Sequence, residues 1–261
     1  MATDKNQKTS WGNVAEWYSD LLEKEEGTYQ KDLILPNILR LMDIKKGEVV
    51  LDLACGQGFF SREFANVGAN VLGADVSKEL IGLAKKISDE KKLKIDYRVS
   101  PADKADFIKE KSIDKIAVIL AIQNIENVAG VFKECQRVLK PGGKLFLVLN
   151  HPAFRIPKQS DWGWDEKEKI QYRKINEYLS ESKVQIQMHP GDNPDEKTIS
   201  FHRPLQYYFK LLGKAGFAVS RLEEWNSHRK SQPGPRAKAE DKARKEIPLF
   251  MCLEIVKINE R

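Results

Sequence analysis

Cysteine and histidine are scarce in this chain, which holds three cysteines and four histidines among 261 residues. The cysteines, at positions 55, 135 and 252, form no pair motif. Their scatter argues against a disulfide scaffold and predicts a reducing, cytoplasmic location. The histidines lie far apart, and none is spaced with a carboxylate as a metal site requires. We therefore expect no bound metal.

Long apolar runs are absent as well. The longest, from Ile116 to Ile122, falls far short of the ~20 residues that span a bilayer. The first eight residues lack the apolar stretch of a secretory signal. We therefore expect neither a membrane span nor export. Hydrophobic residues still make up 41% of the chain, which is enough for a sizeable core.

Positive charge is only slightly in excess, because the chain has 44 Lys and Arg against 38 Asp and Glu, a net charge of +6. Four of these net charges fall in residues 227–246, where seven basic residues oppose three acidic ones. No aromatic residue is interleaved with this basic segment, so nucleic acid is not expected as a partner. A contact with RNA phosphate or with an acidic substrate is the alternative.

The chain does contain a regular alternation of strands and helices. Apolar strands are predicted at residues 48–53, 71–74, 93–99, 113–120 and 144–149, with amphipathic helices following the first, second and fourth. A helix over 204–215 and strands over 217–222 and 249–258 complete the pattern. Repeated strand–helix units predict the α/β class, with a doubly wound, mostly parallel seven-stranded sheet covered by helices on both faces.

We interpret residues 1–261 as one domain with four parts. Residues 1–44 form an N-terminal helical cap, in which Pro36 breaks or restarts a helix. Residues 45–150 hold the first five strands. Residues 151–200 form a lid insertion with a hairpin of residues 184–188 and 198–202, and residues 201–261 supply the last strands and helix.

The strongest motif follows the first strand and runs from Asp52 to Gly58. Glycines in such a turn let a ligand approach the backbone at the N-terminus of the next helix. A dinucleotide site needs a third glycine, where this chain has Ser61. The carboxylate of Asp52 would repel a pyrophosphate and suits a cationic ligand. Asp75, which ends the second strand, is placed to bind ribose hydroxyls with either ligand.

These residues resemble the first motif and the ribose-binding acid of the class I S-adenosylmethionine-dependent methyltransferases, in particular the methyltransferase type 11 group. Residues 139–144, Leu-Lys-Pro-Gly-Gly-Lys, resemble the family's turn before the fifth strand, and residues 202–205 with 215–217 its segment before the sixth. The resemblance covers roughly residues 45–150 and 200–258. It implies a Rossmann-like methyltransferase fold, a transferase and S-adenosyl-L-methionine as cofactor, with residues 45–150 as the cofactor-binding core.

The resemblance also implies which residues hold the cofactor. Asp52, Gly56 and Gly58 would surround its methionine part, Asp75 its ribose, and Ala102 and Asp103 its adenine. The full set of expected cofactor contacts is Asp52, Ala54, Gly56, Gly58, Asp75, Val76, Ala102 and Asp103.

Residues for the chemistry itself are harder to find, since methyl transfer from a sulfonium needs alignment more than a catalytic triad. His151, directly after the fifth strand, is a candidate base or simply a hydrogen-bonded loop residue. His202 and Trp164 are candidate substrate contacts from the insertion, with packing as the alternative. Tyr18 and Tyr29 either close over the cofactor or pack within the cap.

The resemblance favours a methyltransferase acting on an O, N or C nucleophile of a small-molecule acceptor. The alternatives are an RNA or protein methyltransferase that uses the basic segment of residues 227–246, and a cofactor-binding protein that has lost catalysis. The sequence leaves the acceptor and the oligomeric state open.

Overall fold

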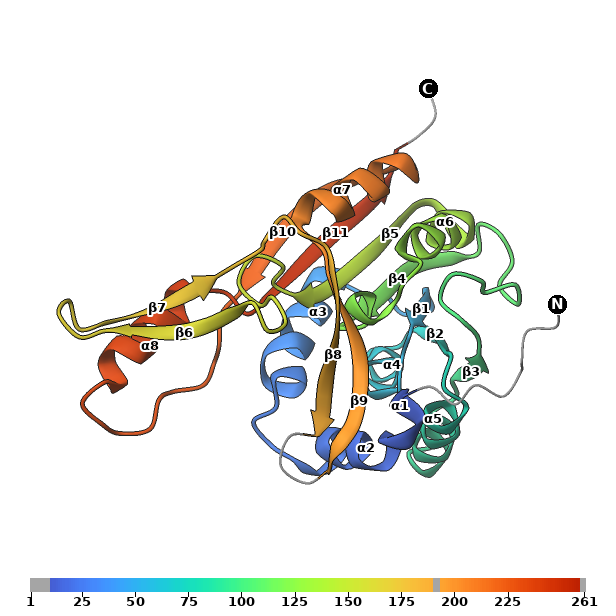
Figure 1. The fold of residues 1–261 in the computed structure, drawn as a ribbon. Helices are drawn as coiled ribbons and strands as arrows, with labels where there is room; N and C mark the ends of the chain where they lie inside the picture. Colours follow the sequence, from blue (N-terminus) through green and yellow to red (C-terminus); the bar gives the residue numbers. More distant parts are fainter. Residues whose placement is uncertain (1–9, 190–192, 259–261) are drawn as a thin grey trace.

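The computed structural model describes residues 10–189 and 193–258; the side chains of Ser10, Asn13, Tyr18 and residues 188–196 lie outside the described part. Its main feature is a seven-stranded sheet in the order β10-β11-β5-β4-β1-β2-β3 (Figure 1). The strands of this sheet are β1 (Val49–Leu53), β2 (Asn70–Asp75), β3 (Asp96–Val99), β4 (Ile113–Ile119), β5 (Leu139–Asn150), β10 (Phe217–Trp225) and β11 (Phe250–Lys257).

The first five strands pair in parallel, and β11 pairs antiparallel with both β5 and β10. The predicted α/β class with a mostly parallel seven-stranded sheet is therefore confirmed. Strand order reverses between β1 and β4, which are neighbours although β2 follows β1 in the chain. In open parallel sheets ligands bind outside the carboxyl ends of the strands at such a reversal.

Successive side chains of a strand point to opposite faces of the sheet, and here both sets are apolar. Helices therefore cover both faces. On one face α6 (Val128–Val138) and α7 (Leu205–Lys214) pack against Leu51 and Leu53 of β1. On the other face α3 (Leu35–Met42) and α4 (Phe59–Asn66) pack against Val50. Ser77 caps α5 (Lys78–Glu90) by accepting from the backbone of Leu80 over 3.2 Å.

The N-terminal region is helical, as expected, and precedes β1. It consists of α1 (Ser10–Asn13), α2 (Ala15–Lys24), a π-helical turn η1 (Gln30–Ile34) and α3, near whose start Pro36 lies. A π-turn running directly into α3 shows that Pro36 restarts a helix, since a proline at the first helical positions loses no intrahelical bond.

Residues 151–200 contain two hairpins, whereas the sequence predicted one. The predicted hairpin is β8 (Ser182–His189) with β9 (Asn193–His202), and the missed one is β6 (Ser160–Asp165) with β7 (Ile170–Ile175). The β8–β9 hairpin contacts α1 and the 3-10 turn η2 (Ile122–Asn124), whereas β7 contacts α8 (Ala237–Glu246). Figure 1 shows β6, β7 and α8 projecting together away from the sheet.

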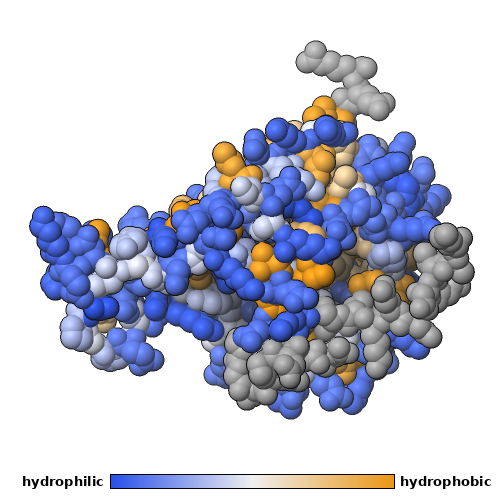
Figure 2. Space-filling view, viewed as in Figure 1, coloured by the Kyte–Doolittle hydropathy of each residue, from blue (hydrophilic) through white to orange (hydrophobic). Residues whose placement is uncertain are grey.

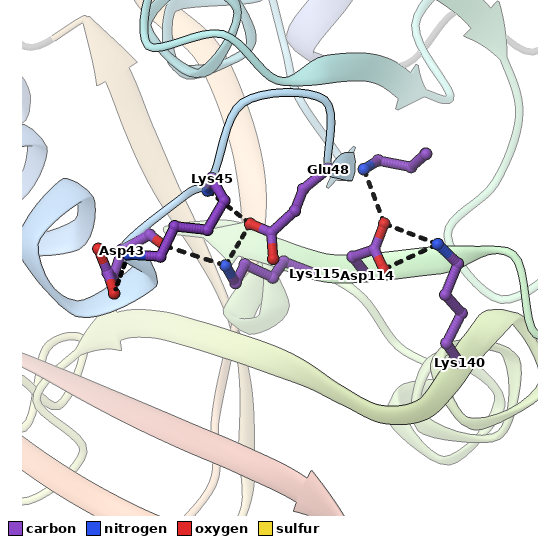
Figure 3. A network of polar contacts seen from close by, with 7 residues as sticks. Asp43, Lys45, Glu48, Asp114, Lys115 and Lys140 are labelled. Carbon is purple, nitrogen blue, oxygen red and sulfur yellow. Dashed lines mark hydrogen bonds and ion pairs between the residues drawn. The ribbon is translucent and has the colours of Figure 1, made fainter.

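At the amino ends of β1 and β4, carboxylates are paired with lysines (Figure 3). Glu48 contacts Lys115, and Asp114 accepts from Lys140 over 2.8 Å and from the backbone of Val49 over 2.9 Å. Asp43 pairs with Lys45 over 2.7 Å. This edge of the sheet thus has its charges neutralised locally.

No helix in the described ranges is both long and apolar enough to cross a membrane.

Candidate functional site

The turn between β1 and α4 takes a backbone path that glycine favours. Ala54, Gly56 and Gly58 have φ values of 60°, 57° and 80°, in the left-handed region. At Gly58 a Cβ atom would lie 2.3 Å from the Tyr97 hydroxyl, so no larger residue fits without displacing the tyrosine. The loop therefore lies close against the end of β2 and β3.

Asp75 fastens this loop to the end of β2. Its Oδ2 accepts from the Gly56 N–H and its Oδ1 from the Ser77 N–H, both over 2.9 Å. Burial raises the pKa of Asp75, while these N–H groups oppose the rise. The Val76 N–H also contributes, but a carboxylate has about four acceptor sites, so acceptor capacity remains for a ligand hydroxyl.

Asp52 lies at the end of β1 with 2% of its surface exposed. Ser61, at the place where a dinucleotide motif would have glycine, donates its hydroxyl to Asp52 over 2.5 Å. Burial raises the pKa of Asp52 to about 7, and the nearby charge of Asp75 adds to the rise.

Among the described residues neither Asp52 nor Asp75 forms an ion pair, in contrast to the lysine-paired acids at the opposite edge of the sheet. Two buried carboxylates without a cation are unfavourable in the free protein. A cationic ligand at this edge would relieve the repulsion.

A cavity of about 140 Å³ opens beside these acids. The expected cofactor residues that line it are Asp52, Ala54, Gly56, Asp75 and Val76. The opposite walls come from the cap and from the segment after β4, through Trp11, Leu22, Gln30, Leu120, Ala121, Asn124 and Ile125. Trp11, Leu22 and Gln30 were not identified as site residues from the sequence.

Three expected cofactor residues do not line this cavity. Gly58 lies at the start of α4, where Tyr97 contacts it. Ala102 packs at the margin of the core. Asp103 accepts from the Asn127 side chain over 2.7 Å, beside the start of α6.

The cap is joined to the glycine turn by a buried arginine. Arg62, 1% exposed, donates to the Gln57 carbonyl and side-chain oxygen, both over 2.7 Å. The same guanidinium pairs with Glu23 of α2, whose other oxygen accepts from Lys91, directly after α5, over 2.8 Å. Arg62 thus connects the cap to the loop that carries Gly56 and Gly58.

His151, directly after β5, is buried but does not line the cavity. Its Nδ1 accepts from the Ala153 N–H over 3.2 Å, which places the ring proton on Nε2, where Glu224 accepts it over 2.7 Å. Burial lowers the pKa of His151 despite Glu224. Neither ring nitrogen is left to take a proton from a substrate.

The two expected substrate contacts from the insertion lie elsewhere. His202 is buried and bonded to the Tyr178 carbonyl over 2.8 Å. Trp164 lines a separate cavity formed with α8. Tyr29 packs edge-on against Phe250 and His228, and the side chain of Tyr18 lies outside the described residues.

Comparisons with known proteins agree with this geometry. The family model described as "Methyltransferase domain" matches residues 51–147. The ubiquinone biosynthesis O-methyltransferase of Xanthomonas oryzae pv. oryzae is 34% identical over 101 residues, which are 39% of this chain and 42% of that protein. That of Actinobacillus pleuropneumoniae is 33% identical over 152 residues, 51% of this chain and 64% of that protein. The chain thus spans less than two thirds of these relatives.

Similarity to a solved structure extends further along the chain. The crystal structure of an S-adenosylmethionine-dependent methyltransferase from Mesorhizobium loti superposes with a TM-score of 0.65 at 26% identity, covering 84% of this chain and 95% of the other. The matched family model covers most of β1, all of β2, β3 and β4, and the cavity residues Asp52 and Asp75. Residues 51–147 therefore match a methyltransferase domain, and the chain shares the fold of an S-adenosylmethionine-dependent methyltransferase.

Proposed function

We propose that this protein transfers the methyl group of S-adenosylmethionine to an oxygen atom of a small molecule. The observation that carries the proposal is the pair of buried carboxylates, Asp52 and Asp75, that lines a cavity without any ion pair among the described residues. The family and the O-methyltransferase activity in the names of the curated relatives support it.

The residues present suit this cofactor. Its ammonium and sulfonium groups are cations, which would favour the ionised form of Asp52 against the cost of burial. Its ribose offers hydroxyls to the remaining acceptor sites of Asp75. Ala54, Gly56 and Val76 supply the backbone surface between the two acids. We propose Asp52, Ala54, Gly56, Asp75 and Val76 as its binding residues.

When bound, the cofactor supplies the activated methyl group, and the chain's task is to orient an acceptor and exclude water. Trp11 and Leu22 cover one side of the cavity with apolar surface. Asn124 and Gln30 are the neutral polar side chains in its wall, and we propose that they orient the acceptor. Asn124 is held by a bond from its Nδ2 to the Ile199 carbonyl over 2.9 Å, which leaves its oxygen available.

No general base is part of this proposal. The titratable groups lining the cavity are Asp52, Asp75 and Cys55, and burial raises the pKa of Cys55 well above its ordinary value. The acids are assigned to the cofactor. An acceptor hydroxyl that ionises readily, such as a phenol, therefore fits this site better than an aliphatic alcohol.

We propose the following organisation around the site. Residues 1–44 cap the cavity, residues 45–150 bind the cofactor, residues 151–200 carry a lid whose active part is the β8–β9 hairpin, and residues 201–261 complete the sheet. A cytoplasmic location is proposed from the three cysteines, all of which are free thiols.

The test is a transfer assay with methyl-labelled S-adenosylmethionine and matched phenol, aliphatic alcohol and amine acceptors. The proposal expects label in phenols. Label only in amines would move the acceptor to nitrogen. Label only in RNA or protein would favour a macromolecular acceptor, and cofactor binding without any transfer would favour a silent binding protein.

A further inference from the structure

The β6–β7 hairpin and α8 border a second cavity, of about 560 Å³, that is half open to solvent. It shares no lining residue with the cavity beside Asp52 and Asp75. Its volume lies within the ~300–1,000 Å³ range of small-molecule sites. The hairpin and the helix are separated by some 60 residues of sequence, and their packing alone creates this space.

The cavity is lined on its helical side by unpaired positive charge. Lys238 and Lys242, one turn apart on α8, both line it, and neither forms an ion pair with any residue that the structure describes. Like charges at this spacing repel each other and weaken the helix. Lys169, in the turn before β7, adds a third amine that is paired with Glu166 over 3.0 Å, and Glu246 is the acid in the lining. An anion would offset this excess.

The hairpin side presents a flat ring and an unsatisfied amide. Trp164 and Gln171 are directly opposite on the paired strands and both line the cavity. The Gln171 side-chain oxygen is buried without a hydrogen-bond partner. A buried polar atom without a partner destabilises the free protein. A ligand with hydrogen-bonding edges would remove that cost.

One further contact fixes the tryptophan. The Arg236 guanidinium lies 4.6 Å from the Trp164 ring centroid and is itself paired with Glu166 over 2.7 Å. Arg236 does not line the cavity, so it covers the ring from outside. The fold therefore brings an aromatic platform to the basic segment of residues 227–246, which has no aromatic residue of its own.

From these observations we propose that the cavity between β6–β7 and α8 binds a nucleotide, with its base against Trp164 and Gln171 and its phosphate between Lys238 and Lys242. Aromatic side chains bind the flat face of any base, and lysines act as point charges for phosphate. Figure 2 shows that the visible face of this extension is mostly hydrophilic, which suits a charged ligand better than an apolar protein partner. The site is independent of methyl transfer.

In the experiment the protein is first saturated with S-adenosylhomocysteine, so that the first cavity is closed to nucleosides. GMP and UMP are then titrated in, and calorimetry measures their binding. We expect binding that weakens at least tenfold when guanosine replaces GMP. The double variant Lys238→Gln/Lys242→Gln should lose at least tenfold in affinity. Ala239→Phe, which fills the space without changing charge, should do the same.

Lys230→Gln is the matched control, because Lys230 belongs to the same basic segment, is exposed and does not line the cavity. Its affinity should stay within twofold of the wild type. Circular dichroism checks that each variant keeps its fold. The proposal is overturned if neither nucleotide binds at millimolar concentration, if the three variants weaken binding equally, or if only a longer RNA binds, which would indicate an extended basic surface instead.

Discussion

The backbone N–H of Gly56 donates to Oδ2 of Asp75 over 2.9 Å, so the glycine turn after β1 is fixed to the acid that ends β2. The two residues lie 19 positions apart, and the parallel pairing of β1 and β2 brings their carboxyl ends together. This contact shapes the cavity before any ligand enters it.

Replacing that acid by its amide should loosen the turn. In Asp75→Asn the side-chain NH₂ must face either the Gly56 or the Ser77 N–H, leaving one buried donor without an acceptor. We expect a loss of about 1–3 kcal/mol in the free energy of unfolding and at least a tenfold loss of S-adenosylhomocysteine affinity. Denaturant unfolding and calorimetry measure the two. Asp106→Asn, at an exposed acid, is the control and should change neither.

Asp52→Asn should stabilise the free protein in a pH-dependent way. Because the pKa of Asp52 is raised from 3.8 to about 7, the folded wild type retains a proton that the unfolded chain releases between these values. Wild-type stability therefore falls relative to the variant as pH rises from 4 to 7, and the difference stays constant above 7. A shift of this size corresponds to a few kcal/mol. Urea unfolding at pH 5, 6, 7 and 8 tests this, and a difference that does not change with pH would contradict the burial argument.

The contact between the cap and the glycine turn should slow release of the cofactor from the wild type. Glu23→Gln removes the carboxylate that pairs with buried Arg62 and with Lys91. We expect release of S-adenosylhomocysteine about tenfold faster, the equivalent of 1.4 kcal/mol, and faster amide hydrogen exchange in α1 and α2. Asp20→Asn, in an exposed pair with Lys24 on the same helix, should leave both rates near wild type. Equal effects from the two variants would show that Glu23 has no special role.

His151 should prove structural. Its ring nitrogens are both engaged, by Ala153 and Glu224, so His151→Ala should cost about 1–3 kcal/mol of stability. Methyl transfer per folded molecule should remain within a few-fold of wild type. Since burial lowers the pKa of His151, the wild type should lose stability as pH falls below the ordinary value of 6.5, and the variant should lose less. A hundredfold loss of transfer rate in a folded variant would restore His151 as a base.

The sequence predicted the central strands, whose residues are buried on both faces of the sheet. The apolar stretch of β4 is an example, since every residue from Lys115 to Ile119 is buried. The β6–β7 hairpin escaped prediction because it is half-exposed and packs mainly against α8, far along the chain. The start of β5 was placed at Lys144, five residues late, because Pro141 to Gly143 indicated a turn rather than a paired strand.

The same distinction holds for the candidate site. Asp52 and Asp75 lie at the ends of neighbouring strands and Gly56 in the turn between them, and all three, which the resemblance implied as cofactor contacts, line the cavity. Trp11 and Gln30 reach it only because the cap docks through Glu23 and Arg62, a contact between residues 39 positions apart. Trp164 was predicted for this site from its residue type, but the direction of its hairpin takes it to the other cavity.

The central claim is that the unpaired acids at the carboxyl edge hold a cationic cofactor, and calorimetry tests it most directly. S-adenosylhomocysteine, which keeps the ammonium group, and NAD are each titrated into the wild type and Asp52→Asn at pH 8. We predict micromolar binding of S-adenosylhomocysteine to the wild type, at least tenfold weaker binding to the variant, and no displacement of bound S-adenosylhomocysteine by NAD. Displacement of S-adenosylhomocysteine by NAD, or equal affinity of both proteins for S-adenosylhomocysteine, would contradict the account.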